Sequence, residues 1–406
     1  MTDNTKNLIS TLHGTPLLDS RYCDIRVVNR DPATGKREGM EGSLSVIFKA
    51  TDQRSGNDVA IKFFDPDIQG FSARYRMDLF ERESRLLERL QNNDRCLQLV
   101  QPLSEIPITM TDRRSGRSIT IKCGYLVLEW LDGSVAEYFM RQQRHEAKVK
   151  LLLFRNIVLG TFALHRQSII HRDLKQDNLR QVLRNGRDIV VALDLGTAVD
   201  LTSPQIGSAR DYAEPVGASA FAPIEAHAGL SGVRELLVYT DIYGLGCLLH
   251  DLFNAELFLA RAARDPGFNA CLGACYNHMK TVLQRTSDSD ELVREWKGII
   301  QLTRGQVSHP GIRSATTSVP AGIRDQMDVL LRSLTDVDYR RRTVELDKIL
   351  RRIDSACRAL DNRLVEERAR ARRAERRRRR EIKANRRQLY ADAMPNLTIS
   401  AGEHNA

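Results

Sequence analysis

The first third of the chain alternates apolar and polar positions with a period of two. Such alternation is typical of strands that bury one face, and turn residues such as those of "DQRSGND" (52–58) separate the runs. One stretch, "RMDLFERESRLLERL" (76–90), instead repeats its large apolar residues near helical spacing. The pattern predicts an antiparallel sheet over residues 23–130 that is interrupted by one helix. The predicted strands are "CDIRVVN" (23–29), "SLSVIFKA" (43–50), "DVAIKFF" (58–64), "SITIKC" (118–123) and "YLVLEW" (125–130).

The pattern changes to long apolar helices beyond residue 146. "EAKVKLLLFRNIVLGTFALHRQ" (146–167) and "VYTDIYGLGCLLHDLF" (238–253) predict buried helices, and "VELDKILRRIDSACRAL" (344–360) predicts an amphipathic one. Between them, "LRQVLRNGRDIVVALDLG" (179–196) predicts a hairpin that turns at its Asn-Gly pair. No internal repeat is visible. The fold class is therefore expected to be α+β, with a small sheet-rich part before a larger helical part.

These patterns divide the chain into four segments. Residues 1–22 show no firm periodicity and are expected to form a loosely held N-terminal arm. The sheet-rich part covers 23–130, and "EWLDGSV" (129–135) joins it to a helical part at 134–360. Residues 361–406 form a C-terminal tail of different composition.

The composition is that of a folded protein. The 406 residues are 42% hydrophobic and 28% charged, and no run approaches the roughly 18 to 20 apolar residues of a membrane span. The start lacks the layout of a signal peptide, so a cytoplasmic protein is expected. Seven scattered cysteines favour a reducing compartment. Cys271, Cys275 and His278 could share a helix face, but no second cluster supplies further ligands, so no metal site is predicted there.

The positive charge is concentrated in the tail. Residues 363–387 hold thirteen Lys or Arg and four Glu, a balance of +9, so the rest of the chain carries about +1 of the total of +10. Helix propensity is high, but Leu364 and Ala371 begin a heptad that Arg378 interrupts, which argues against a coiled coil. The tail is expected to be a solvated helix, or one that adheres by charge to nucleic acid, anionic lipid or an acidic partner.

The densest chemistry lies in "HRDLKQDN" (171–178). This segment resembles the catalytic loop of the protein kinase family, H-R-D-L-K-x-x-N, at every defined position. The resemblance implies that Asp173 orients the attacking hydroxyl, that Lys175 stabilises the transferring phosphate and that Asn178 binds metal. Lysine at position 175, where tyrosine-specific members usually carry alanine, favours serine or threonine as acceptor.

Other motifs follow in the order found in that family. "DVAIKFF" resembles the strand whose lysine, here Lys62, pairs the ATP phosphates, and "FERESRLLERL" the helix whose glutamate, here Glu83, holds that lysine. "ALDLGTA" resembles the D-F-G segment, with Asp194 as the metal-binding carboxylate and leucine in place of phenylalanine. In "SAFAPIEA" Glu225 matches the A-P-E glutamate, and of two neighbouring arginines Arg341 is expected to pair with it. "YTDIYGLG" supplies Asp241, which matches the carboxylate that braces the catalytic loop.

The resemblance implies a bilobal kinase-like fold that binds ATP and Mg2+ and transfers the gamma phosphate to protein serine or threonine. "YLVLEWLDG" resembles the hinge that receives adenine through backbone groups. Metal would be held by Asn178 and Asp194. The expected nucleotide contacts are Gly42, Ile47, Ala60, Lys62, Leu128, Glu129, Leu131, Asn178, Arg180 and Asp194.

Three departures from the family pattern concern affinity and substrate handling, although every group that performs the transfer is present. Two of them, the phosphate-covering loop and Arg180, support the alternative of a catalytically silent pseudokinase scaffold. The three glycines of the phosphate-covering loop fall on Met40, Gly42 and Ser45, with Gly39 as another register. Arg180 replaces the leucine beneath adenine, where its stem would cover the ring or its guanidinium would stack on it. Ala218 replaces a threonine that hydrogen-bonds Asp173 and Lys175, a role open to Ser219. A third alternative is an adaptor that binds nucleic acid or membrane through the tail.

Regulation by phosphate is a further hypothesis. Arg172 precedes Asp173, and in the family this arginine often receives a phosphate from the segment between Asp194 and Glu225. The hypothesis is autophosphorylation at Thr202, Ser203 or Ser208, and the alternative is that these loop hydroxyls are never modified. The candidate hydroxyls of the segment are Thr197, Thr202, Ser203, Ser208 and Tyr212.

Overall fold

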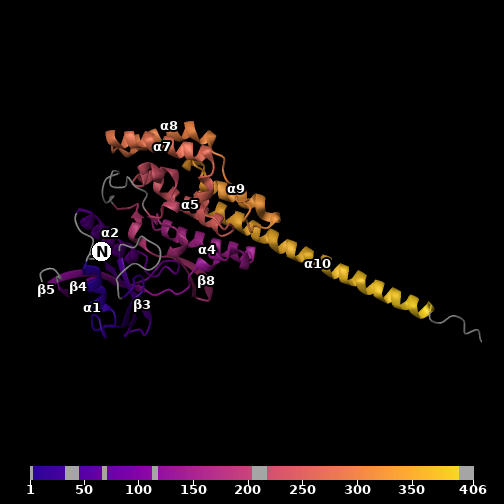
Figure 1. Cartoon of the computed structure of the whole chain (residues 1–406), viewed down its shortest axis with the longest axis horizontal. Helices are drawn as coiled ribbons and strands as arrows, with labels where there is room; N and C mark the ends of the chain where they lie inside the picture. The colour runs from indigo at the N-terminus through magenta and orange to yellow at the C-terminus, as the bar shows by residue number, and fades with distance from the viewer. Residues whose placement is uncertain (1–2, 33–44, 66–70, 112–117, 204–216, 393–406) are drawn as a thin grey trace, which may run out of the picture. The chain divides into compact units, whose positions relative to one another are not determined.

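The computed structural model of the chain describes residues 3–32, 45–65, 71–111, 118–203 and 217–392 (Figure 1). Its contacts separate two units, Met1–Ile353 and Asp354–Ala406. The first unit contains the predicted sheet-rich part and the predicted helical part up to Ile353.

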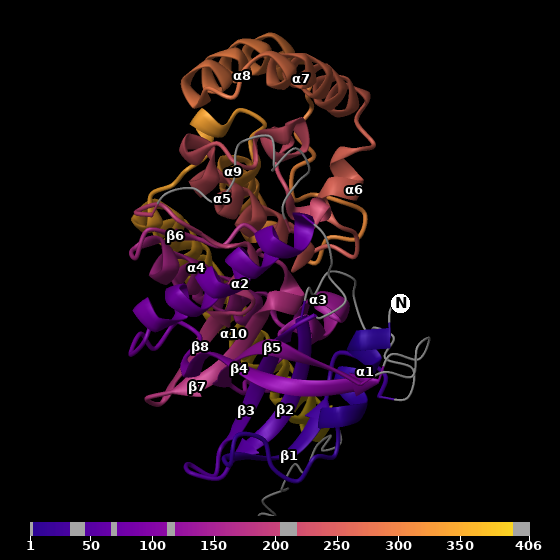
Figure 2. The same ribbon diagram turned by 90° about the vertical axis from the view of Figure 1, so that its left-hand side faces the viewer.

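The sheet-rich part is one five-stranded antiparallel sheet in the order β1-β2-β3-β5-β4. Its register places Ile47 opposite Lys62 and Ala60 opposite Leu128, so these residues lie on adjacent strands. Figure 2 shows this sheet at one end of the unit and α7 and α8 at the other. The elements of this part are β1 (Tyr22–Val27), β2 (Ser45–Asp52), β3 (Asp58–Phe64), α2 (Phe71–Arg89), β4 (Leu99–Thr111) and β5 (Ser118–Glu129).

The helical part surrounds α4 and α5, which are buried along most of their length. The hairpin turns where the sequence predicts it, because Asn185 and Gly186 both take positive φ angles, of 52° and 70°. A sheet-rich part before a helical part confirms the predicted α+β bilobal fold. The elements are α3 (Ala136–Met140), α4 (Ala147–His165), β6 (Ile169–Ile170), η2 (Gln176–Asn178), β7 (Leu179–Arg184), β8 (Arg187–Ala192), η3 (Leu195–Thr197), β9 (Val199–Asp200), η5 (Ser219–Phe221), η6 (Ala226–Leu230), α5 (Arg234–Asp251), α6 (Phe258–Ala262), α7 (Pro266–Arg285), α8 (Ser289–Thr303), α9 (Arg324–Thr335) and η9 (Tyr339–Arg341).

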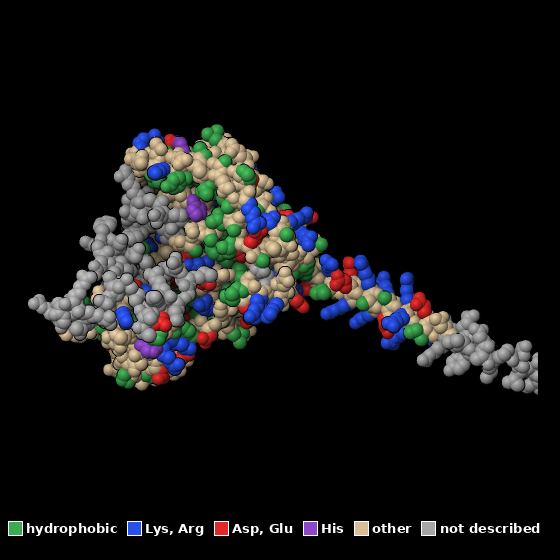
Figure 3. Space-filling view, viewed as in Figure 1, with side chains coloured by type: hydrophobic (Ala, Val, Ile, Leu, Met, Phe, Trp, Pro, Cys, Tyr) green, Lys and Arg blue, Asp and Glu red, His purple; other side chains and the backbone are tan. Residues whose placement is uncertain are grey.

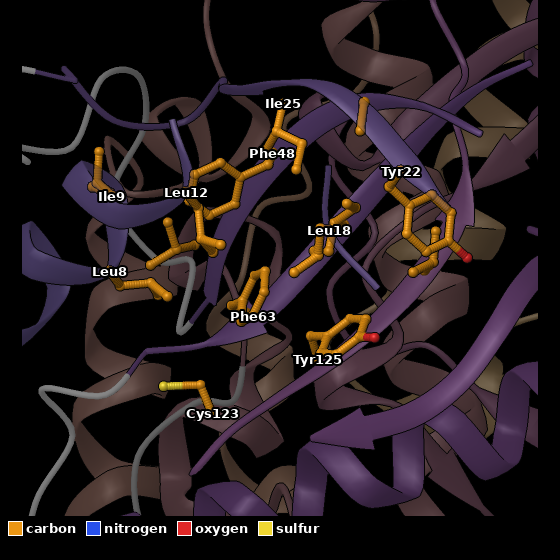
Figure 4. Close-up of a cluster of buried hydrophobic side chains, with 14 of the residues drawn as sticks. Leu8, Ile9, Leu12, Leu18, Tyr22, Ile25, Phe48, Phe63, Cys123 and Tyr125 are labelled. Carbon is orange, nitrogen blue, oxygen red and sulfur yellow. The ribbon is translucent and has the colours of Figure 1, made fainter. Parts of the chain in front are cut away.

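The expectation of a loosely held N-terminal arm is wrong for α1 (Asp3–Leu12). Leu8, Ile9 and Leu12 are buried in one cluster with the aromatic side chains of the sheet (Figure 4). Because of their spacing, these three residues lie on the same side of a helix of about three turns. The sheet covers this apolar side.

A polar network also holds α1 in place. The Thr5 hydroxyl donates to the Asp65 carboxylate at the end of β3, and Arg30 forms an ion pair of 2.6 Å with the same carboxylate. All three residues are buried. The segment is thus part of the folded unit.

The helix α10 (Leu346–Asp392) begins in the first unit and forms the described part of the second. The prediction placed the tail boundary at residue 361, whereas the contacts divide at Asp354. No break in secondary structure marks either position, because the helix runs through both.

The helices and the acidic and thiol side chains of the described ranges bear on membranes and metals. None of their helices combines the length and the apolar content that crossing a bilayer requires. No three His, Cys, Asp or Glu side chains among these residues are grouped to hold a metal ion. Cys271 is buried and lies 3.3 Å from the Thr303 hydroxyl.

We predict that Leu8→Ala lowers the free energy of unfolding by about 2–5 kcal/mol, because it leaves a cavity in the cluster beneath α1. Urea denaturation of the full chain, followed by circular dichroism, measures the change. Thr11→Ala, on the exposed side of the same helix, is the matched control and should change stability little. Equal, small effects for both variants would mean that α1 does not contribute to the core.

Candidate active site

Three chain segments meet at the ammonium group of Lys62. Lys62 Nζ lies 2.8 Å from both carboxylate oxygens of Glu83 and 2.8 Å from Asp194 Oδ1. Lys62 is on β3, Glu83 is on α2, and Asp194 follows β8. The structure therefore brings together three residues that the sequence singled out 21 and 132 positions apart.

The charges of this cluster shift the pKa values of all three residues. The Lys62 ammonium holds the pKa of Asp194 down to about 2, against the opposing effect of burial. Burial lowers the pKa of Lys62, but the carboxylates of Asp194 and Glu83 outweigh it and raise that pKa overall. Burial raises the pKa of Glu83, and Lys62 limits the rise. Asp194 is consequently an anion beside a fixed cation.

The catalytic-loop candidates converge on Asp173. Lys175 Nζ lies 3.0 Å from Asp173 Oδ2, and Asn178 Nδ2 donates to the same oxygen at 2.9 Å. Asn178 Nδ2 also donates to the Asp173 carbonyl at 2.9 Å, and this bond closes the loop on itself. Asp173 and Asn178 are buried.

Asp241 fixes the backbone of this loop from α5. Its carboxylate accepts hydrogen bonds from the backbone N–H groups of His171 and Arg172, at 2.8 and 2.7 Å. His165 Nε2 lies 2.8 Å from the same carboxylate. Arg172 has a positive φ of 65°, a conformation that the two backbone bonds hold in place. Burial raises the pKa of Asp241, but these partners outweigh it and lower that pKa overall.

The remaining donor to Asp173 comes from the backbone. Ala218 N donates to Asp173 Oδ1 at 2.7 Å, so the Ala218 amide rather than the Ser219 hydroxyl makes the bond to Asp173 that the threonine would make. Gly217 makes this approach possible, because its φ is 82° and a Cβ there would lie 2.6 Å from the Arg172 carbonyl oxygen.

A cavity of about 410 Å³ lies between the sheet and the catalytic loop. Every expected nucleotide contact within the described residues lines it, while Gly42, Met40 and Gly39 lie outside those residues. The predicted residues on its wall are Ile47, Ala60, Lys62, Leu128, Glu129, Leu131, Asn178, Arg180 and Asp194.

Comparison with known proteins identifies this arrangement. A family model described as "Protein kinase domain" matches residues 39–351. The chain belongs to the protein kinase family. Among curated kinases, it is 27% identical over 231 residues to a putative cyclin-dependent kinase F-2 of Oryza sativa subsp. japonica, covering 55% of this chain and 63% of that protein.

Two further kinases are similar to this chain at nearly the same identity. It is 26% identical to the serine/threonine-protein kinase bur1 of Emericella nidulans, over 54% of this chain and 39% of that protein. It is also 26% identical to a probable serine/threonine-protein kinase of Streptomyces coelicolor, over 64% of this chain and 34% of that protein. The chain thus matches less than two thirds of the length of each relative.

Arg180 of this kinase is held by backbone carbonyls rather than left as a free charge. Its Nη1 donates to the carbonyl oxygens of Asp177 and Leu179, both at 2.9 Å. Burial lowers the pKa of its guanidinium, and Asp177 limits the fall. The desolvation cost expected for an arginine on the cavity wall is therefore offset locally.

Asn29 lines the cavity but is not among the predicted contacts. Its Oδ1 accepts from Ile47 N at 2.9 Å and its Nδ2 donates to the Ser45 carbonyl at 3.0 Å, so it holds the first residues of β2. Its only signal in the sequence is an asparagine at the end of an apolar run, a signal that any loop could give.

The candidate phosphorylation sites Thr202 and Ser203 both bind Asp200 in the kinase. Their hydroxyls donate to its carboxylate at 2.6 Å each, and the guanidinium of Arg89 from α2 pairs with it as well. Burial raises the pKa of Asp200, but the hydroxyls outweigh it and lower that pKa to about 2. Arg234 donates to the Ser203 carbonyl at 2.7 Å. Ser208 and Tyr212 lie outside the described residues.

The predicted partner of Glu225 is wrong by one position. Arg342, not Arg341, forms the buried ion pair, with Nη2 lying 3.0 Å from Glu225 Oε2. The 3-10 turn η9 ends at Arg341 and leaves that side chain exposed, whereas Arg342 turns inward over the Tyr243 ring. The sequence does not reveal the phase of this short turn.

We predict that Arg342→Met destabilises the kinase by about 3–5 kcal/mol, because it leaves the Glu225 carboxylate buried without its counter-charge. Arg341→Met is the matched control and should cost well under 1 kcal/mol at an exposed position. Chemical denaturation measures both. Equal losses in the two variants would contradict the pairing.

Proposed function

We propose that this kinase uses ATP and Mg2+ to phosphorylate serine or threonine residues of proteins. The observation that carries the proposal is the hydrogen bonding of Asp173. A carboxylate has about four acceptor positions. Among the described residues, Ala218 N occupies one on Oδ1, and Lys175 and Asn178 occupy two on Oδ2. One position on Oδ1 is left for a substrate hydroxyl.

The donor set fits nucleotide and metal. Asn178 commits its amide nitrogen to Asp173, which leaves its oxygen for a cation, and Asp194 is an anion with 42% of its side chain exposed. Two oxygen donors with phosphates and water suit Mg2+. Bound Mg2+ would neutralise phosphate charge, and Lys62 would contact the phosphates while Glu83 keeps it in place.

The transfer step would use the chain's own groups as follows. Asp173 orients the hydroxyl and receives its proton, the hydroxyl oxygen bonds to the gamma phosphorus, and the bond to the bridging oxygen of ADP breaks. Lys175 neutralises charge on the transferring group. Its presence beside Asp173, at 3.0 Å, supports serine or threonine as the acceptor.

Asp173→Asn is expected to abolish phosphate transfer, because the amide cannot take up the hydroxyl proton. The measurement is the intact mass of the full chain and of a generic acceptor protein after incubation with ATP and Mg2+. Wild type should gain phosphate increments. Asp188→Asn, an exposed carboxylate on β8, is the matched control and should behave like wild type. The absence of increments from wild type would favour the pseudokinase scaffold instead.

We also propose autophosphorylation at Thr202, Ser203 or Ser208. The guanidinium groups of Arg89 and Arg234 already lie beside the first two residues and would pair with a phosphate there. Such a phosphate would repel Asp200 and break the turn that this carboxylate caps.

Peptide mapping after incubation with ATP should find phosphate in the segment that contains these three residues, in wild type but not in Asp173→Asn. Phosphate in both proteins would show that another kinase placed it. A wild-type kinase that modifies an acceptor yet carries no phosphate in this segment would contradict the autophosphorylation alone.

A further inference from the structure

The helix α10 presents positive charge on all sides. Within residues 363–383, whose side chains are all exposed, eleven are Lys or Arg and four are Glu. Figure 3 shows Lys and Arg side chains along the visible face of this helix. At 100° per residue, no arc wider than about 80° around the helix lacks a cation. A helix that only needed solubility would not require such uniform charge.

Few of these cations are neutralised within the helix. Three arginines form i,i+4 pairs with glutamates, between Arg363 and Glu367, Arg370 and Glu366, and Arg379 and Glu375. Exposed pairs of this kind contribute little stability. The other eight cations have no carboxylate within 4 Å among the described residues. Most of the charge is therefore available to a partner.

The distribution argues against a flat membrane as that partner. An interfacial helix needs a broad apolar face opposite its basic face. Here the arc free of cations holds only two large apolar side chains, Leu364 and Ile382, about 27 Å apart along the axis, with Glu375 between them. Little apolar area would be buried in lipid, and six of the ten arginines would face away from it.

A helix in a groove of duplex DNA meets phosphates on two sides, whereas a helix on a membrane meets lipid on one side. The major groove of B-form DNA is about 12 Å wide and admits an α-helix, and its two walls are lines of phosphates. Residues 363–383 form a rod of about 30 Å, close to one turn of the duplex. Phosphates on both sides match cations on all sides. No aromatic residue lies in this stretch to stack on unpaired bases.

We propose that residues 363–383 of α10 bind double-stranded DNA through its phosphates, seated in the major groove and without sequence preference. This site is separate from the proposed kinase reaction, and its role would be to hold the kinase on a DNA-associated target. Non-specific affinity of this origin depends strongly on salt.

The test is fluorescence anisotropy of the full chain with a labelled duplex of arbitrary sequence and about two helical turns. Binding should fall by about 10³-fold or more between about 50 and 200 mM salt, as expected for six or more phosphate contacts. Affinity that ignores salt, or no binding at the lower salt concentration, would overturn the proposal.

Two matched variants isolate the charge. Replacement of six arginines by glutamine should weaken binding by at least about 10²-fold, whereas replacement of the same six by lysine should keep it within a few-fold. Both residues are good helix formers, and circular dichroism checks the helix. If the glutamine variant bound the duplex with the affinity of the wild type, the DNA site would lie elsewhere. The six positions are Arg372, Arg373, Arg376, Arg377, Arg378 and Arg380.

Three other probes distinguish the partner class. Single-stranded DNA at equal phosphate concentration should bind more weakly, and equal binding would overturn the seating in a groove. Vesicles of phosphatidylserine and phosphatidylcholine that bind more tightly than the duplex would make the partner a membrane. If polyglutamate displaced the duplex at equal charge concentration, the partner would be an acidic protein.

The DNA proposal and the kinase proposal can fail independently. Loss of DNA binding should leave phosphate transfer unchanged.

Discussion

The ion pair between Lys62 and its two carboxylates is the constraint on which the rest of the site depends. Buried charges are costly unless each has a partner, so the buried Lys62 and Glu83 must meet, and the half-buried Asp194 is the second counter-charge of the ammonium group. Their meeting requires that β3, α2 and the segment after β8 take definite positions. The shape of the cavity follows, because its walls belong to the same elements.

Asp241 plays the corresponding part for the helical region. It is almost fully buried, and instead of an arginine or lysine it binds two backbone amides and a histidine. Its hydrogen bonds set the path of the main chain at His171 and Arg172, the two residues that precede Asp173. The geometry of one loop thus depends on a residue 70 positions later in the sequence.

The sequence predicted those features of the site that lie in short motifs. It did not predict features that depend on the path of the chain in space. The cavity wall could be anticipated because residues such as Lys62 and Asp194 occur in recognisable local patterns. The burial of α1 could not, because three apolar residues in ten do not separate a docked helix from a frayed one. Arg341 was preferred to Arg342 because the phase of a 3-10 turn leaves no pattern in the sequence.

The contact between Ala218 and Asp173 has a consequence for how such chains are compared. Its donor is a main-chain amide, so any side chain at position 218 except proline keeps the bond, and only the turn at Gly217 is restricted. A comparison that scores this position by the presence of threonine would record a lost interaction, although the hydrogen bond is made. The carboxylate of Asp173 therefore stays anchored whichever of these side chains stands at position 218.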